Sequence, residues 1–117
     1  MERGFRPDHI LRLLEDAHQT ICFLEPKGLR KFTENFNNPK IQLSRRIKEL
    51  ERDLKRTDIR LESFLISQTF RHQLRWPSPR DSQRDANGED FLQQHILCAK
   101  DDPDSYVRTL LEKIGSR

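Results

Sequence analysis

Glycine and proline, the residues that most often interrupt helices, are missing from the middle of this sequence. Between Pro39 and Pro77 there is no glycine and no further proline. Apolar residues recur there every three or four positions, which is the spacing of a helix seam that faces a partner. The residues of this seam are Leu43, Ile47, Leu50, Leu54, Leu61 and Phe64. The sequence therefore predicts one long helix over about residues 39–76, with no hinge at Thr57-Asp58.

Apolar residues and cysteines are also scarce. Only 33% of the 117 residues are hydrophobic, 35% are charged, and no apolar run approaches the length of a membrane span. The N-terminal residues lack the pattern of a secretory signal. Two cysteines, Cys22 and Cys98, are too few for the disulfide framework of a small secreted domain. We expect an intracellular protein, in the cytoplasm or the nucleus, whose modest core needs a partner.

The segments around the long stretch also favour helices. Asp8 can cap a helix with apolar residues from Ile10 to Leu24, and Leu29, Phe32 and Phe36 mark a short second one. Residues 77–90 have no apolar periodicity and the composition of a flexible linker. Two short helices follow over about residues 91–99 and 103–114, the second preceded by Asp102 as its cap.

These patterns predict an all-α fold, a small bundle of about five helices built on the long central one. Residues 1–76 form a helical core in this interpretation, residues 77–90 a linker, and residues 91–117 a helical pair. The pair is too small to hold a core of its own, so we expect it to pack back on the long helix or on another chain.

Motifs of common enzyme classes are missing. The sequence has no glycine-rich phosphate loop, no Gly-x-Ser-x-Gly and no His-Glu-x-x-His. A zinc site could form if His18 and Cys22 met His95 and Cys98, but isolated residues of these types on apolar faces are usually ordinary packing. We therefore expect a non-enzymatic protein without catalytic residues, cofactor or metal.

Positive charge is concentrated in the middle of the chain, although the net charge is only +3. Residues 39–76 carry ten lysines and arginines against five acidic residues. The candidates for nucleic-acid contact are Arg45, Lys48, Arg52, Lys55, Arg56, Arg71 and Arg75. Interleaved acids such as Glu49 and Asp53 weaken this positive field and favour a solvated helix face.

The first functional hypothesis is a scaffold or adaptor subunit that self-associates, or docks on a partner protein, through the apolar seam of the long helix. A helix of this length is roughly 55 Å long and extends beyond a compact domain, so part of the seam is left for another chain. The alternative is a small nucleic-acid-binding protein that uses the basic face of the same helix. No membrane partner is expected.

Overall fold

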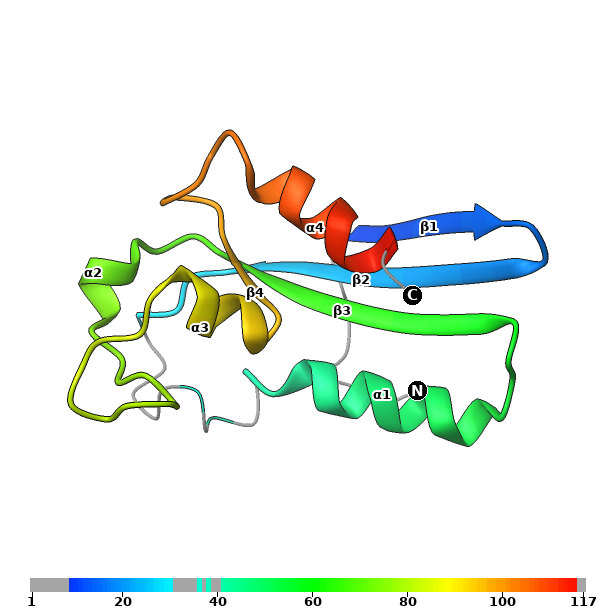
Figure 1. The fold of residues 1–117 in the computed structure, drawn as a ribbon, viewed down its shortest axis with the longest axis horizontal. Helices are drawn as coiled ribbons and strands as arrows, with labels where there is room; N and C mark the ends of the chain where they lie inside the picture. Colours follow the sequence, from blue (N-terminus) through cyan, green and yellow to red (C-terminus); the bar gives the residue numbers. More distant parts are fainter. Residues whose placement is uncertain (1–8, 31–35, 37, 39–40, 116–117) are drawn as a thin grey trace.

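A computed structural model describes residues 9–30, 36, 38 and 41–115 of the protein. Four strands form one mixed sheet in the order β1-β2-β3-β4 (Figure 1). The strands are β1 (His9–Glu15), β2 (His18–Lys27), β3 (Ile59–Ser67) and β4 (Ile96–Cys98). β1 and β2 form an antiparallel hairpin, whereas β2, β3 and β4 run parallel to one another.

Helices connect the parallel strands, because parallel neighbours cannot be joined by a tight turn. The helix α1 (Leu43–Leu54) lies between β2 and β3 in the chain, and α2 (Arg71–Leu74) and α3 (Gly88–Gln93) lie between β3 and β4. The last helix, α4 (Tyr106–Gly115), follows β4. Figure 1 shows α1 running along β3, with α2 and α3 grouped towards the opposite end of the fold.

Alternation along β3 gives the sheet two buried faces, since successive side chains of a strand point to opposite sides. Leu61 and Leu65 belong to a hydrophobic cluster that includes Ile47 of α1. Phe64, between them, belongs to a second cluster that includes Leu110 of α4. The two helices therefore cover opposite faces of one sheet, and the core is a three-layer α/β arrangement.

An aromatic cluster closes one end of the α1 layer. The ring centroid of Phe36 lies 5.1 Å from that of Trp76 and 4.9 Å from that of Phe91, and both contacts are edge-on. Trp76 and Phe91 stack at 5.7 Å. All three side chains are buried, so they join the segments before α1 and after β3 to α3.

The prediction of an all-α bundle is wrong, because the protein has a mixed sheet and β3 lies inside the predicted long helix. The helix that forms, α1, ends at Leu54. Lys55 has a φ of 54°, and its N–H donates to the carbonyl of Arg52. A residue in the left-handed conformation ends a helix, a role that glycine usually has. The chain therefore turns close to Thr57-Asp58, where no hinge was predicted.

The first predicted helix is wrong as well, because residues 9–27 form the hairpin of β1 and β2. Asp16, with a φ of 53°, lies in its turn. Most of the second predicted helix falls on residues 31–35 and 37, outside the described part of the chain. The helix predicted over about residues 103–114 is confirmed as α4. In the helix predicted over about residues 91–99, residues 96–98 instead form the strand β4.

The predicted linker over residues 77–90 contains backbone hydrogen bonds. The amide of Ala86 donates to the carbonyl of Trp76 at 2.7 Å, and the amide of Ser78 to that of Arg84 at 2.9 Å. Its last residues, from Gly88, begin α3. The division into three segments and the mobility of this one remain predictions. Within the described ranges, no helix has both the length and the apolar character needed to cross a membrane.

Candidate functional site

The carboxyl ends of the three parallel strands meet at one edge of the sheet. Lys27 at the end of β2 pairs with Ser67 at the end of β3, and Ser67 pairs with Cys98 at the end of β4. In open α/β sheets, ligands bind outside the carboxyl ends of the strands. This edge is therefore the expected place for a ligand site.

Hydrogen bonds hold the loop after β2 against the loop after β3. The amide of Gln68 donates to the carbonyl of Lys27 at 2.8 Å, and the amide of Leu29 donates to Oγ1 of Thr69 at 3.1 Å. Ser67 and Thr69 are buried, and Oγ of Ser67 donates to the carbonyl of Thr69 at 2.8 Å. The backbone around Lys27 is thus held at two points by the loop after β3.

Glu25 and Lys27 bring opposite charges to this edge. They are two residues apart on β2, so both side chains lie on the face of the sheet that carries α1. Nζ of Lys27 lies 3.7 Å from Oε1 of Glu25, and the two side chains are only 25% and 23% exposed. A half-buried carboxylate next to an ammonium group can bind a cation and an anion side by side.

A basic surface lies along α1, at a separate place. Arg45, Lys48 and Arg52 line a shallow cavity of about 310 Å³ together with Ser44, Glu49 and His95. A neighbouring cavity of about 340 Å³ shares Lys48 and His95 with it and adds Arg60 and Lys113. The two cavities together form what we call the basic surface.

Glu62 lies at the centre of the basic surface and is buried. Its Oε1 lies 2.6 Å from Nζ of Lys48 and 3.1 Å from Nε of Arg60, and its Oε2 lies 3.9 Å from Nδ1 of His95. Burial alone raises the pKa of this carboxyl, but the hydrogen bonds from Lys48 and Arg60 outweigh it and lower the pKa. The carboxylate is therefore charged and orients the cations around it.

The structure brings together three of the seven residues predicted to contact nucleic acid, namely Arg45, Lys48 and Arg52. The other four lie apart from that cavity. Lys55 caps α1, and Arg56 pairs with Asp58 at 2.6 Å. Arg71 bonds to Asp102 at 3.3 Å, and Arg75 lies 3.7 Å from Asp85. As nucleic-acid contacts, all seven remain predictions.

The six residues of the predicted interface do not form one seam. All of the first four belong to α1. The side chains of Leu43 and Ile47 are buried on its inner face, whereas those of Leu50 and Leu54 are half exposed. Leu61 and Phe64 are buried on opposite faces of β3. Contact of any of them with another chain remains a prediction, and Leu50 and Leu54 are the ones with exposed surface for it.

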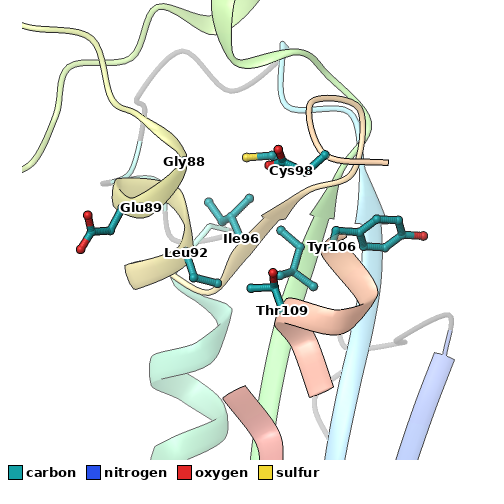
Figure 2. Close-up of a pocket in the computed structure, with 9 residues that line it drawn as sticks. Gly88, Glu89, Leu92, Ile96, Cys98, Tyr106 and Thr109 are labelled. Atoms are coloured by element: carbon teal, nitrogen blue, oxygen red, sulfur yellow. The ribbon is translucent and has the colours of Figure 1, made fainter. Parts of the chain in front are cut away.

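A third cavity, of about 290 Å³, lies between α3, β4 and α4 (Figure 2). Its walls include the apolar side chains of Leu92 and Ile96. In Figure 2 the carboxylate of Glu89 and the ring of Tyr106 point away from its centre. These two titratable groups therefore do not converge in the cavity.

Both cysteines are buried free thiols. Burial raises the pKa of Cys22 to about 12 and also raises that of Cys98. Neither thiol is therefore a ready nucleophile at neutral pH. Among the residues that the structure describes, no group of three or more histidine, cysteine or acidic side chains could hold a metal ion.

Comparisons of the chain with protein-family models, with curated proteins and with solved structures find no match. The site is therefore interpreted from its own residues.

Sequence reasoning missed Glu25 and Lys27 because they directly follow the apolar residues from Ile10 to Leu24 that predicted a helix. On a helix, residues two apart do not share a face. On a strand they do, so the pair became visible only with β2. The available signal was a carboxylate and a lysine at alternate positions directly after an apolar run.

Proposed function

We propose that this domain hydrolyses phosphodiester bonds of nucleic acid with a divalent cation, and that Glu25 and Lys27 are its catalytic pair. The observation that carries the proposal is the position of the two side chains. Both lie on one face of the sheet at the carboxyl end of β2, and Nζ of Lys27 lies 3.7 Å from Oε1 of Glu25. The proposal differs from the expected non-enzymatic role, which was inferred because motifs of common enzyme classes are missing from the sequence.

The two side chains fit the needs of this reaction. Mg²⁺ is commonly held by one or two carboxylates together with phosphate oxygens of the substrate, so Glu25 is a suitable protein ligand. The ammonium of Lys27 can pair with the same phosphate as a point charge. A divalent cation held by Glu25 would supply stabilisation of the charge that develops on the phosphate and would lower the pKa of the attacking water.

The chemistry is a hydrolysis. The oxygen of a water molecule forms a new bond to phosphorus, and the bond from phosphorus to the leaving oxygen breaks. One proton of the water ends on the leaving oxygen, and the other is released to solvent. Lys27 would hold the non-bridging oxygens while their negative charge grows.

A second carboxylate, that of Asp8, is next to this hairpin in the sequence. Asp8 directly precedes His9, the first residue of β1, and His9 pairs with Leu24, the residue before Glu25. Asp8 lies outside the described residues, so the proposal includes it only as a variant to be tested.

Nucleic acid is the proposed substrate because of the basic surface. Arg45 and Arg52 supply cations at one cavity and Lys113 at the next, whereas Lys48 and Arg60 are paired with Glu62. Rows of cations neutralise successive phosphates of a polynucleotide, whereas a small phosphate ester needs only one cluster. The alternative function inferred from the sequence, nucleic-acid binding, is thus kept as part of the proposal.

The test uses the purified chain with end-labelled DNA and RNA, each single- and double-stranded. We expect cleavage with Mg²⁺ or Mn²⁺ and none with EDTA. Lys27→Met should reduce the rate by about 10²-fold, the usual cost of losing one group that stabilises the transition state. Lys100→Met, which changes an exposed lysine, is the matched control.

Asp8→Asn should reduce the rate to a similar degree if Asp8 is the second carboxylate. Absence of cleavage of all four substrates by the wild-type chain would contradict the proposal. Equal rates for Lys27→Met and Lys100→Met would contradict the role of Lys27.

A further inference from the structure

The strand β1 lies at one edge of the sheet. One side of β1 pairs with β2, and within the described ranges no strand pairs with its other side (Figure 1). An unpaired strand edge presents N–H and carbonyl groups to any chain that can pair with them. Natural edge strands usually block this with charges, proline or bulges.

β1 carries little of this protection. Four of its seven residues are apolar, and Arg12 is the one charged residue between His9 and Glu15 at its ends. Ile10 is 55% exposed and Leu14 is 77% exposed. They lie on the same face of the strand, because their positions differ by an even number. An exposed apolar edge strand is a surface suited to pairing.

The sequence of β1 is complementary to itself in the antiparallel direction. With Arg12 opposite Arg12 of a second copy, Ile10 faces Leu14 and Leu11 faces Leu13. At both ends the imidazole of His9 faces the carboxylate of Glu15. All seven residues of β1 are then paired. Apolar residues meet apolar residues, and hydrogen-bond donors meet acceptors.

Other registers that keep the same faces of the two sheets together pair the side chains less well. A shift of one copy by two residues leaves fewer residues paired and puts Arg12 opposite Leu14 or Ile10. A shift by one residue would bring opposite faces of the two sheets together. The Arg12 pair is unfavourable in the best register, but like charges opposite each other typically cost less than about 1 kcal/mol on an exposed strand.

We propose that two copies of this chain dimerise through β1, which extends the sheet across a two-fold axis at Arg12. The interface is isologous, since the same strand is used by both copies. Light scattering of the wild-type chain should give twice the chain mass of 14.0 kDa at tens of micromolar. A monomer under these conditions would overturn the proposal.

Cysteine crosslinking tests the register. In Arg12→Cys the two new thiols face each other with Cα atoms about 5 Å apart, within the range that a disulfide spans. In the matched variant Leu14→Cys the two thiols are offset by four residues, about 13 Å. We expect Arg12→Cys to crosslink at least about tenfold faster. The native cysteines are buried, so the wild-type chain gives a low background.

Two aspartate variants distinguish a dimer interface at β1 from one at the exposed leucines of α1. Leu14→Asp should give a folded monomer, because its side chain is already mostly exposed in one copy. Leu50→Asp changes an exposed leucine of α1 and should leave the dimer intact. Dissociation by Leu50→Asp and not by Leu14→Asp would assign the interface to α1. Equal crosslinking by the two cysteine variants would rule out the register.

Discussion

Nζ of Lys48 lies 2.6 Å from Oε1 of Glu62, and this contact joins α1 to β3 at the centre of the basic surface. Oε2 of Glu51 accepts the amide of Leu61 at 2.6 Å nearby. Arg60 reaches from the same strand to the carbonyl of Ile114 at the end of α4. Three elements are thus joined by polar contacts around one buried carboxylate.

Replacement of Glu62 with glutamine should lower the free energy of unfolding by about 1–3 kcal/mol, because Lys48 and Arg60 lose the charge they are bonded to. Glu49→Gln changes an exposed carboxylate of α1 and should stay within about 0.5 kcal/mol of the wild type. Urea unfolding of both variants measures the difference. Equal midpoints would show that Glu62 contributes no net stability.

Asp90 should make stability depend on pH at the acid end. Its side chain is buried, bonded to Arg80 at 2.9 Å and Arg84 at 3.1 Å, and it accepts the amide of Asn87. Burial alone raises the pKa of Asp90, but these bonds lower it from 3.8 to about 2. A lowered pKa means that the native state holds the proton less tightly than the unfolded chain.

The contribution of Asp90 to the free energy of unfolding is fully present above the unfolded pKa near 3.8 and is lost as the pH falls towards 2. The urea midpoint of the wild-type chain should therefore fall over that range, and that of Asp90→Asn should fall less. Asp104→Asn, an exposed aspartate, is the matched control. Parallel pH profiles for wild type and Asp90→Asn would contradict the assignment.

Two neighbouring positions on α1 should differ sharply in their response to truncation. Ile47 is 1% exposed, whereas Leu50 is 51% exposed. Ile47→Ala should cost about 2–5 kcal/mol of unfolding free energy, the usual range for a buried isoleucine. Leu50→Ala should cost less than about 1 kcal/mol in the isolated chain. Similar losses at both sites would mean that α1 does not pack as described.

Arginines of the basic surface should contribute to nucleic-acid affinity. The double variant Arg45→Gln and Arg52→Gln should weaken binding of a labelled duplex. It should also lower the slope of log affinity against log salt by about one for each phosphate that is no longer neutralised. Arg108→Gln on α4, also exposed, should leave both quantities unchanged. Fluorescence anisotropy at several salt concentrations measures them, and an unchanged slope in the double variant would place the nucleic acid elsewhere.

The sequence predicted the helices of the fold better than its strands. Residues 43–54 were expected to be helical and are, because their apolar residues recur with a helical period. The pattern then continued by coincidence into β3, where Leu61 and Phe64 lie three apart and end on opposite faces. β3 is buried on both faces, so its apolar residues include the continuous run Phe64-Leu65-Ile66 and show no two-residue alternation that would mark a strand.

The turns were hidden because they do not use glycine. Among the residues that the structure describes, four other than glycine have a positive φ: Asp16, Lys55, Arg75 and His95. Each lies next to the end of a helix or between two elements, where glycine is the usual choice. An absence of glycine therefore did not mean an absence of turns. The Glu25 and Lys27 pair was missed because their segment was predicted to be the end of a helix, and the hairpin turn at Asp16 carries no glycine that would have contradicted that prediction.

The rate of nucleic-acid cleavage by Glu25→Gln is the most direct test of the proposed function. Glu112→Gln, an exposed carboxylate of α4, serves as the control, and circular dichroism checks that both variants are folded. With saturating Mg²⁺ and enzyme in excess over substrate, the account predicts a rate at least about 10²-fold lower for Glu25→Gln than for Glu112→Gln. Equal rates in two folded variants would contradict it.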